Sequence, residues 1–208
     1  PLYQMKKILV VFSIFCLGFL FSPLSAMAYE GEFIISAGTE PQGIDPAMIE
    51  GVPEHRIYLS LFEGLISYSE RDASPIPGIA KSWYSSNGGK TYTFKLRESK
   101  WSDGVPVTAQ TFVDSWYRML DPETASPYAW FPNMFIKGAE DFNSGKAGKE
   151  AVQIRALGRM TFQIDLVGPL PYVIGALAHY SFAAAPMHVI NKYGKDWTKT
   201  ENFVSNGP

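Results

Sequence analysis

The strongest alternation of hydrophobic and polar residues in the chain lies between Thr91 and Leu96. From Tyr92 onward every second residue is aromatic or leucine, which is the period of a strand that buries one face. The preceding segment 87–89 (Asn-Gly-Gly) is a strong turn signal, so we predict a hairpin whose other strand contains Trp83 and Tyr84.

Helical spacing is clearest between Thr108 and Leu120, where hydrophobic residues recur every three or four positions. Thr108 has the side chain of an N-cap, and Asp121 ends the pattern because a residue before proline is forced out of the α region. Shorter helices are predicted over residues 57–65, 172–178 and 187–193, a first strand over 33–38, and a second hairpin from the alternating runs 152–156 and 162–166. This mixture predicts an α/β chain of the mixed α+β kind.

Aromatic residues gather on and around these elements. We expect most of them to form the core, because Trp116 falls on the apolar face of the predicted helix. Trp130 and Phe131 lie in an irregular stretch, residues 125–138, and are the members expected to reach the surface. The other members of this aromatic cluster are Trp83, Trp101 and Tyr117. Residues 67–77 and 142–149 are predicted to be polar connections between elements.

The amino end has the order of features of a secretory signal peptide. Basic residues 6–7 precede an apolar run over residues 8–21, and residues 26–28 (Ala-Met-Ala) form a small-x-small cleavage site. A retained membrane anchor is the alternative, which the run disfavours because a spanning helix needs about 20 apolar residues. The only cysteine, Cys16, follows a phenylalanine inside this run, so we see no lipoprotein site. We therefore expect residues 1–28 to be upstream residues and a signal peptide cleaved near Ala28.

Composition and motifs argue against several classes of function. A net charge of −2 gives no basic patch for nucleic acid. His55, His179 and His188 are far apart and lack metal-ligand spacing, and the sequence has no nucleophile elbow, phosphate loop or dinucleotide motif. We therefore predict no enzyme activity, no cofactor, no metal site and no nucleic-acid partner.

Residues 92–97 and the Trp-Ser-Asp-Gly turn at 101–104 resemble the signature of the peptide- and nickel-binding class of extracellular solute-binding proteins, family 5. Members of that family are the capture subunits of ABC importers. Residues 108–113 and 121–129 are similar to its oligopeptide-binding branch. The resemblance implies a two-lobed, class II-like periplasmic-binding-protein fold with an inserted subdomain, of which this chain would be the amino-terminal portion.

In that arrangement residues 29–62 would belong to the first lobe, residues 63–187 would form the inserted α+β subdomain, and residues 188–208 would return to the first lobe before the second lobe begins. The resemblance implies a periplasmic component of an oligopeptide ABC transporter. It would capture short peptides, close its lobes around them and deliver them to the membrane permease subunits.

The resemblance also implies ligand-binding residues. Glu50, Gly51 and Val52 would supply an extended backbone that pairs with the peptide and a carboxylate near its amino end. Tyr128 would line the peptide cleft with its ring or hydroxyl. Each has a simpler interpretation as well, because Gly51 is a common turn former and a tyrosine such as Tyr128 often packs its ring under a loop.

Other functions stay open at this point. The same family fold could bind a dipeptide, a murein peptide, haem or nickel. An exported, chaperone-like interaction protein could use the same lobe to hold unfolded chains. The hypothesis of a hydrolase is weakened because the sequence shows no pattern of a nucleophile with a base.

Overall fold

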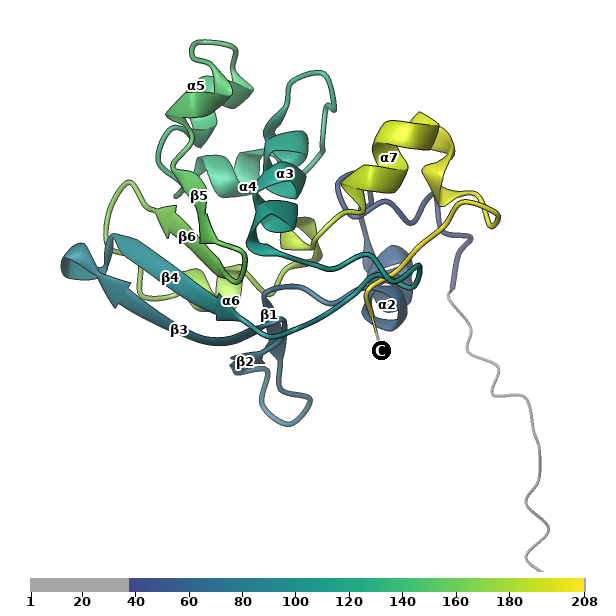
Figure 1. The fold of residues 1–208 in the computed structure, drawn as a ribbon, viewed down its shortest axis with the longest axis horizontal. Helices are drawn as coiled ribbons and strands as arrows, with labels where there is room; N and C mark the ends of the chain where they lie inside the picture. Colours follow the sequence, from purple (N-terminus) through teal and green to yellow (C-terminus); the bar gives the residue numbers. More distant parts are fainter. Residues whose placement is uncertain (1–37, 208) are drawn as a thin grey trace, which may run out of the picture. The chain divides into compact units, whose positions relative to one another are not determined.

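Two hairpins combine into one antiparallel sheet in the computed structural model, which describes residues 38–207 (Figure 1). The sheet has four strands in the order β3-β4-β6-β5. Both hairpins predicted from the alternating patterns are therefore confirmed. The strands are β3 (Ala80–Ser86), β4 (Thr91–Leu96), β5 (Ile154–Gly158) and β6 (Thr161–Asp165), and the short 3-10 helix η1 (Asn87–Gly89) joins the first pair.

The register of the sheet places its large side chains in one layer. Phe94 of β4 lies opposite Trp83 on one neighbouring strand and Phe162 on the other. The rings of Phe94 and Phe162 are 6.1 Å apart, and both residues are fully buried. The buried face predicted for the central strand is thus the centre of the hydrophobic core.

Helix α3 (Ala109–Leu120) covers this face of the sheet and confirms the predicted amphipathic helix. Thr108 caps it in a reciprocal pair with Thr111, and the helix stops before Asp121. Trp116 is fully buried, with its ring 5.0 Å from that of Phe162. Burial of such aromatic rings supplies most of the hydrophobic stabilisation at this contact.

The helix α2 (Val52–Leu61) begins and ends earlier than the pattern over residues 57–65 predicted. It starts directly after Gly51, with Pro53 in its first turn, and Phe62 is already in an extended conformation. Proline is favoured in a first turn because the missing N–H would have no helical partner there. Phe62 and Leu65 are buried as expected, but from the segment that follows the helix.

A small hairpin of β1 (Ile66–Tyr68) and β2 (Pro75–Pro77) lies where the sequence indicated only a polar connection. Three-residue strands are too short to show an alternation, and prolines usually argue against a strand. Proline is nevertheless accepted in a strand at a sheet edge. The segments predicted as irregular or as loops likewise contain short helices, α4 (Trp130–Asn133) and α5 (Ala139–Asn143).

The remaining elements follow the sheet in the chain. The predicted helices over residues 172–178 and 187–193 are confirmed as α6 (Val173–Ala176) and α7 (Met187–Tyr193). The backbone then returns to α2, because the Gly207 N–H donates to the Leu61 carbonyl at 2.9 Å (Figure 1). Short 3-10 helices complete the list: η2 (Lys149–Ala151), η3 (Tyr180–Phe182) and η4 (Gly194–Thr198).

Asp45 joins elements that are distant in sequence. Its carboxylate accepts hydrogen bonds from Arg118 of α3 at 2.9 and 2.5 Å and from the Trp197 indole of η4 at 3.1 Å. Its Oδ1 also accepts from the backbone N–H of Ala47. A largely desolvated carboxylate with this many donors holds the loop before α2 against α3 and η4.

The signal peptide and most of the first strand predicted over residues 33–38 lie outside the described residues. The lobe boundaries at 62/63 and 187/188 remain predictions. In the described part of the chain, no helix combines the length and hydrophobicity that crossing a membrane requires.

Candidate functional site

Aromatic and histidine rings from distant segments form a continuous row, which we call the aromatic row. Tyr128 is its centre, with its ring centroid 4.8 Å from that of His179, 5.4 Å from Tyr180 and 6.1 Å from Trp130. His55 of α2 continues the row, 5.4 Å from Tyr180. These spacings are within the range of favourable aromatic contacts.

Hydrogen bonds to the core fix the segments that carry these rings. The Trp116 indole donates to the carbonyl of Phe182 at 3.0 Å, which ties η3 to α3. His179 accepts the backbone N–H of Ser181 on its Nδ1 and so caps η3. Ser126 donates to the Ala47 carbonyl at 2.5 Å, which ties the turn before Tyr128 to the loop before α2. The row is therefore held from several sides.

Tyr180 brings the residues expected to bind ligand together. Burial raises the pKa of the Tyr180 phenol, the neighbouring Tyr128 side chain and Glu50 carboxylate raise it further, and the backbone of Gly51 opposes the rise. Of the expected ligand-binding residues, Tyr128 lies nearest to Tyr180 by ring geometry, with the two centroids 5.4 Å apart. Tyr128 is half-buried, so its ring both packs and remains accessible.

One expectation about the backbone needs correction. Val52 is the first residue of α2, so its backbone is helical and does not continue an extended segment. Gly51 has φ 97° and ψ 175°, a combination that favours glycine because a Cβ would be strained there. Glu50 and Gly51 lie outside regular secondary structure, directly before the helix, while Val52 presents an exposed side chain.

The histidines of the row are held in their neutral form. Burial and, to a smaller extent, the nearby His55 together lower the pKa of His179 to about 4. Burial also lowers the pKa of His55. Near neutral pH the row therefore carries no positive charge of its own.

Acidification should destabilise the protein through His179. An unfolded chain protonates this imidazole near pH 6.5, whereas the folded chain does so only near pH 4. Between those values the unfolded state binds more protons, so the free energy of unfolding falls as the pH falls. His179→Asn keeps a capping acceptor but does not titrate, so it should lose less stability between about pH 7 and pH 4.5 in urea denaturation. Equal losses in both proteins would contradict this assignment.

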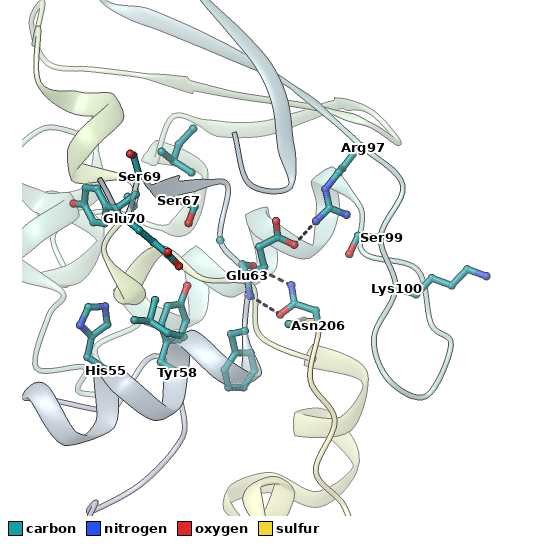
Figure 2. A pocket seen from close by; sticks show the side chains of 17 residues that line it. His55, Tyr58, Glu63, Ser67, Ser69, Glu70, Arg97, Ser99, Lys100 and Asn206 are labelled. Atoms are coloured by element: carbon teal, nitrogen blue, oxygen red, sulfur yellow. Dashed lines mark hydrogen bonds and ion pairs between the residues drawn. The ribbon is translucent and has the colours of Figure 1, made fainter. Parts of the chain in front are cut away.

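A pocket of about 830 Å³ opens beside the row (Figure 2). His55 and Tyr58 enter it from α2, opposite Ser67 and Ser69. Burial raises the pKa of Tyr58, with a further rise from the Glu63 carboxylate, so this phenol stays protonated. The volume is within the range of small-ligand sites, and the lining combines apolar rings with hydroxyl groups.

Glu63 organises the far side of this pocket. Its carboxylate pairs with Arg97, and its backbone N–H and carbonyl both bond to the Asn206 side chain, at 3.2 and 3.0 Å (Figure 2). Arg97 also donates to the Gly78 carbonyl. These charges are paired with each other, which indicates a structural role on this side of the pocket.

A second pocket of about 590 Å³ lies at the amino end of α2 and includes Glu50. The buried Glu54 also lines it and accepts the backbone N–H of Gln42 at 2.9 Å. The helix thus contributes to both pockets, Glu54 to this one and His55 to the larger one. In residues 38–207 no group of His, Cys, Asp or Glu side chains could hold a metal ion.

Sequence reasoning did not identify His55, His179 and Tyr180 as members of a site. They are contributed by α2 and the 179–180 segment, which are far apart in sequence and carry no local motif. Only the tertiary contacts bring them together. Trp130, expected to reach the surface, is exposed, and Trp101 and Trp116 are buried as expected.

Comparisons with known proteins agree on one family. The family model described as bacterial extracellular solute-binding proteins, family 5 Middle, matches residues 74–208. The periplasmic oligopeptide-binding protein OppA of Escherichia coli is 42% identical over 183 residues, which cover 87% of this chain and 33% of OppA. The periplasmic murein peptide-binding protein MppA of Escherichia coli is 39% identical over 186 residues, covering 88% of this chain and 34% of MppA.

A solved structure supports the same fold. The crystal structure of Haemophilus influenzae OppA in complex with RPPGFSPFR superposes with a TM-score of 0.79 at 39% sequence identity. The match covers 83% of this chain and 34% of that one. The chain spans about a third of the length of the curated relatives that it matches. The family resemblance read from residues 92–129 is confirmed.

Proposed function

The chain belongs to the bacterial extracellular solute-binding proteins of family 5, and from this premise we propose that it carries the first part of a site that captures short peptides. The observation that supports this most is the aromatic row, which brings the Tyr128 ring and the His55 ring of α2 each to 5.4 Å from the Tyr180 ring. Glu50 and Gly51 directly precede α2. The relatives OppA and MppA are named for binding oligopeptides and murein peptide, and one OppA structure contains the peptide RPPGFSPFR.

The site suits a ligand whose sequence varies. The backbone at Glu50 and Gly51 offers hydrogen-bonding groups to a peptide backbone, which is the same in every peptide. The aromatic row beside it offers apolar surface, and Glu50 offers a negative charge for an ammonium group. Water in the adjoining pockets of about 830 and 590 Å³ would fill the space left by small side chains.

The proposal extends to the setting of the protein. It would act in the periplasm after cleavage of its signal peptide, bind peptide without making or breaking a bond, and deliver it to the permease subunits of an ABC importer. A second lobe would close over the bound peptide, a movement typical of binding proteins with a hinge.

The direct test is the identity of whatever binds to the full-length protein in the cell. The protein is purified without denaturation, then denatured, and the small molecules that it releases are identified by mass spectrometry. The proposal predicts a mixture of short peptides with no common sequence. Release of a single dipeptide or murein peptide would replace the proposed ligand within the same family. Release of haem or nickel would overturn the proposal of peptide capture. An empty but folded protein would favour the chaperone-like alternative.

A further inference from the structure

Trp130 differs from the other tryptophans in its exposure. It is 54% exposed, whereas Trp101, Trp116 and Trp197 are buried in the core. Large apolar side chains that stay open to solvent beside a binding site frequently serve that site, because their exposure costs hydrophobic free energy. Because Trp130 lies at the end of the aromatic row, its exposed ring is open to a ligand that lies along the row.

The ring of Trp130 continues the aromatic row. Its centroid is 6.1 Å from that of Tyr128 and 5.3 Å from that of Phe131, at interplanar angles of 34° and 31°. Both ring pairs are tilted, and the indole remains 54% exposed, so part of its apolar surface stays open. Met134, one helical turn further on, is also exposed and enlarges this surface.

The chemistry next to Trp130 is uncharged near neutral pH. The row members that touch Tyr128 are the His179 and Tyr180 rings, and the low pKa of His179 keeps its imidazole neutral. Against the Trp130 ring itself a charged side chain of a ligand would lose hydration. An aromatic side chain would stack on the indole and displace water from both surfaces.

We infer that Trp130 is a specificity-determining residue that stacks against an aromatic side chain of the bound peptide. This inference rests on the proposed function, because it requires a peptide beside Tyr128. It adds a preference within an otherwise variable mixture of peptides, namely for a phenylalanine, tyrosine or tryptophan at one fixed position. Other positions of the peptide would stay unselective.

The test compares alanine tetrapeptides that carry one phenylalanine at each position in turn with the all-alanine peptide, by calorimetric titration of the full-length protein. At one position phenylalanine should tighten binding by about 3- to 10-fold. Trp130→Ala should abolish this gain, so that the phenylalanine peptide binds this variant no more tightly than the all-alanine peptide does. Trp130→Phe should retain most of the gain, because a ring remains.

Tyr84→Ala is the matched control, because Tyr84 is also 54% exposed but belongs to β3. It should leave the phenylalanine preference intact. A second readout uses indole fluorescence: phenylalanine-containing peptide should shift the emission of the wild type, and Trp130→Phe should remove that shift.

The possible failures are distinguishable. If Trp130→Ala keeps the phenylalanine preference, or weakens every peptide equally, the inference is wrong and peptide capture stands. If the wild type binds all the peptides alike, there is no aromatic subsite. If the wild type binds none of them, the proposed function fails and the inference fails with it.

Discussion

Gly138→Ala is expected to lower the free energy of unfolding by more than about 3 kcal/mol. Gly138 precedes α5 with φ 80°, where an alanine is strained by about 1–2 kcal/mol on conformation alone. A Cβ at this position would also lie 2.0 Å from the carbonyl oxygen of Ala151 and 2.5 Å from its carbonyl carbon. Backbone atoms cannot rotate aside as a side chain can, so the segment at Gly138 and the segment at Ala151 must move apart.

The separation would reach the sheet. The neighbouring Lys137 donates its N–H to Asp165 at the end of β6 and accepts from Gln153 just before β5, at 3.0 and 2.9 Å. Moving Gly138 away from Ala151 pulls on both bonds. Urea denaturation of the full chain measures the difference in the free energy of unfolding between Gly138→Ala and the unsubstituted protein.

Gly145→Ala is the matched control. Gly145 also has a positive φ, 75°, but nothing lies within 4 Å of a Cβ built there. Its substitution should therefore cost only the conformational strain, about 1–2 kcal/mol. Equal losses for the two glycines would show that the contact with Ala151 does not constrain the fold.

Asp45→Ala is expected to destabilise the protein by about 3 kcal/mol. The Asp45 and Arg118 side chains are only 13% and 17% exposed, so removing the carboxylate leaves a largely desolvated guanidinium without its partner. The Trp197 indole N–H loses its acceptor as well. The loop before α2 would loosen, so peptide binding should weaken along with the melting temperature.

Arg159→Gln controls for the loss of an ion pair in general. Arg159 and Glu98 are 3.8 Å apart and 60% and 75% exposed. Such surface pairs contribute about 0–1 kcal/mol because solvent screens them. If Asp45→Ala were as mild as Arg159→Gln in urea denaturation, Asp45 would not be the connection that we describe.

Local sequence signals were enough to predict the centre of the fold. The strand at 91–96, its turn at 87–89 and the Thr108 cap each depend on neighbouring residues, and each is present in the structure. The first turn of α2 was harder, because Gly51 and Pro53 also suit a loop. The β1–β2 hairpin forms through pairing between two strands of three residues, which are too short to show an alternating pattern in the sequence.

The candidate site was predictable only in part. Glu50, Gly51 and Tyr128 came from family resemblance, and their role in binding remains a prediction. Tyr180 contacts the rings of Tyr128 and His55, and the Trp116–Phe182 hydrogen bond across the core holds its segment in place. A contact of that kind leaves no pattern in the sequence.

The central claim is that a peptide lies along the aromatic row beside Gly51. The most direct measurement is photo-crosslinking of the full-length protein to a short peptide that carries benzoylphenylalanine, followed by proteolysis and mass spectrometry of the attachment sites. Attachment within residues 50–55, 126–131 or 179–181 is the predicted result. Attachment confined to segments away from the row, such as β3, would contradict the account.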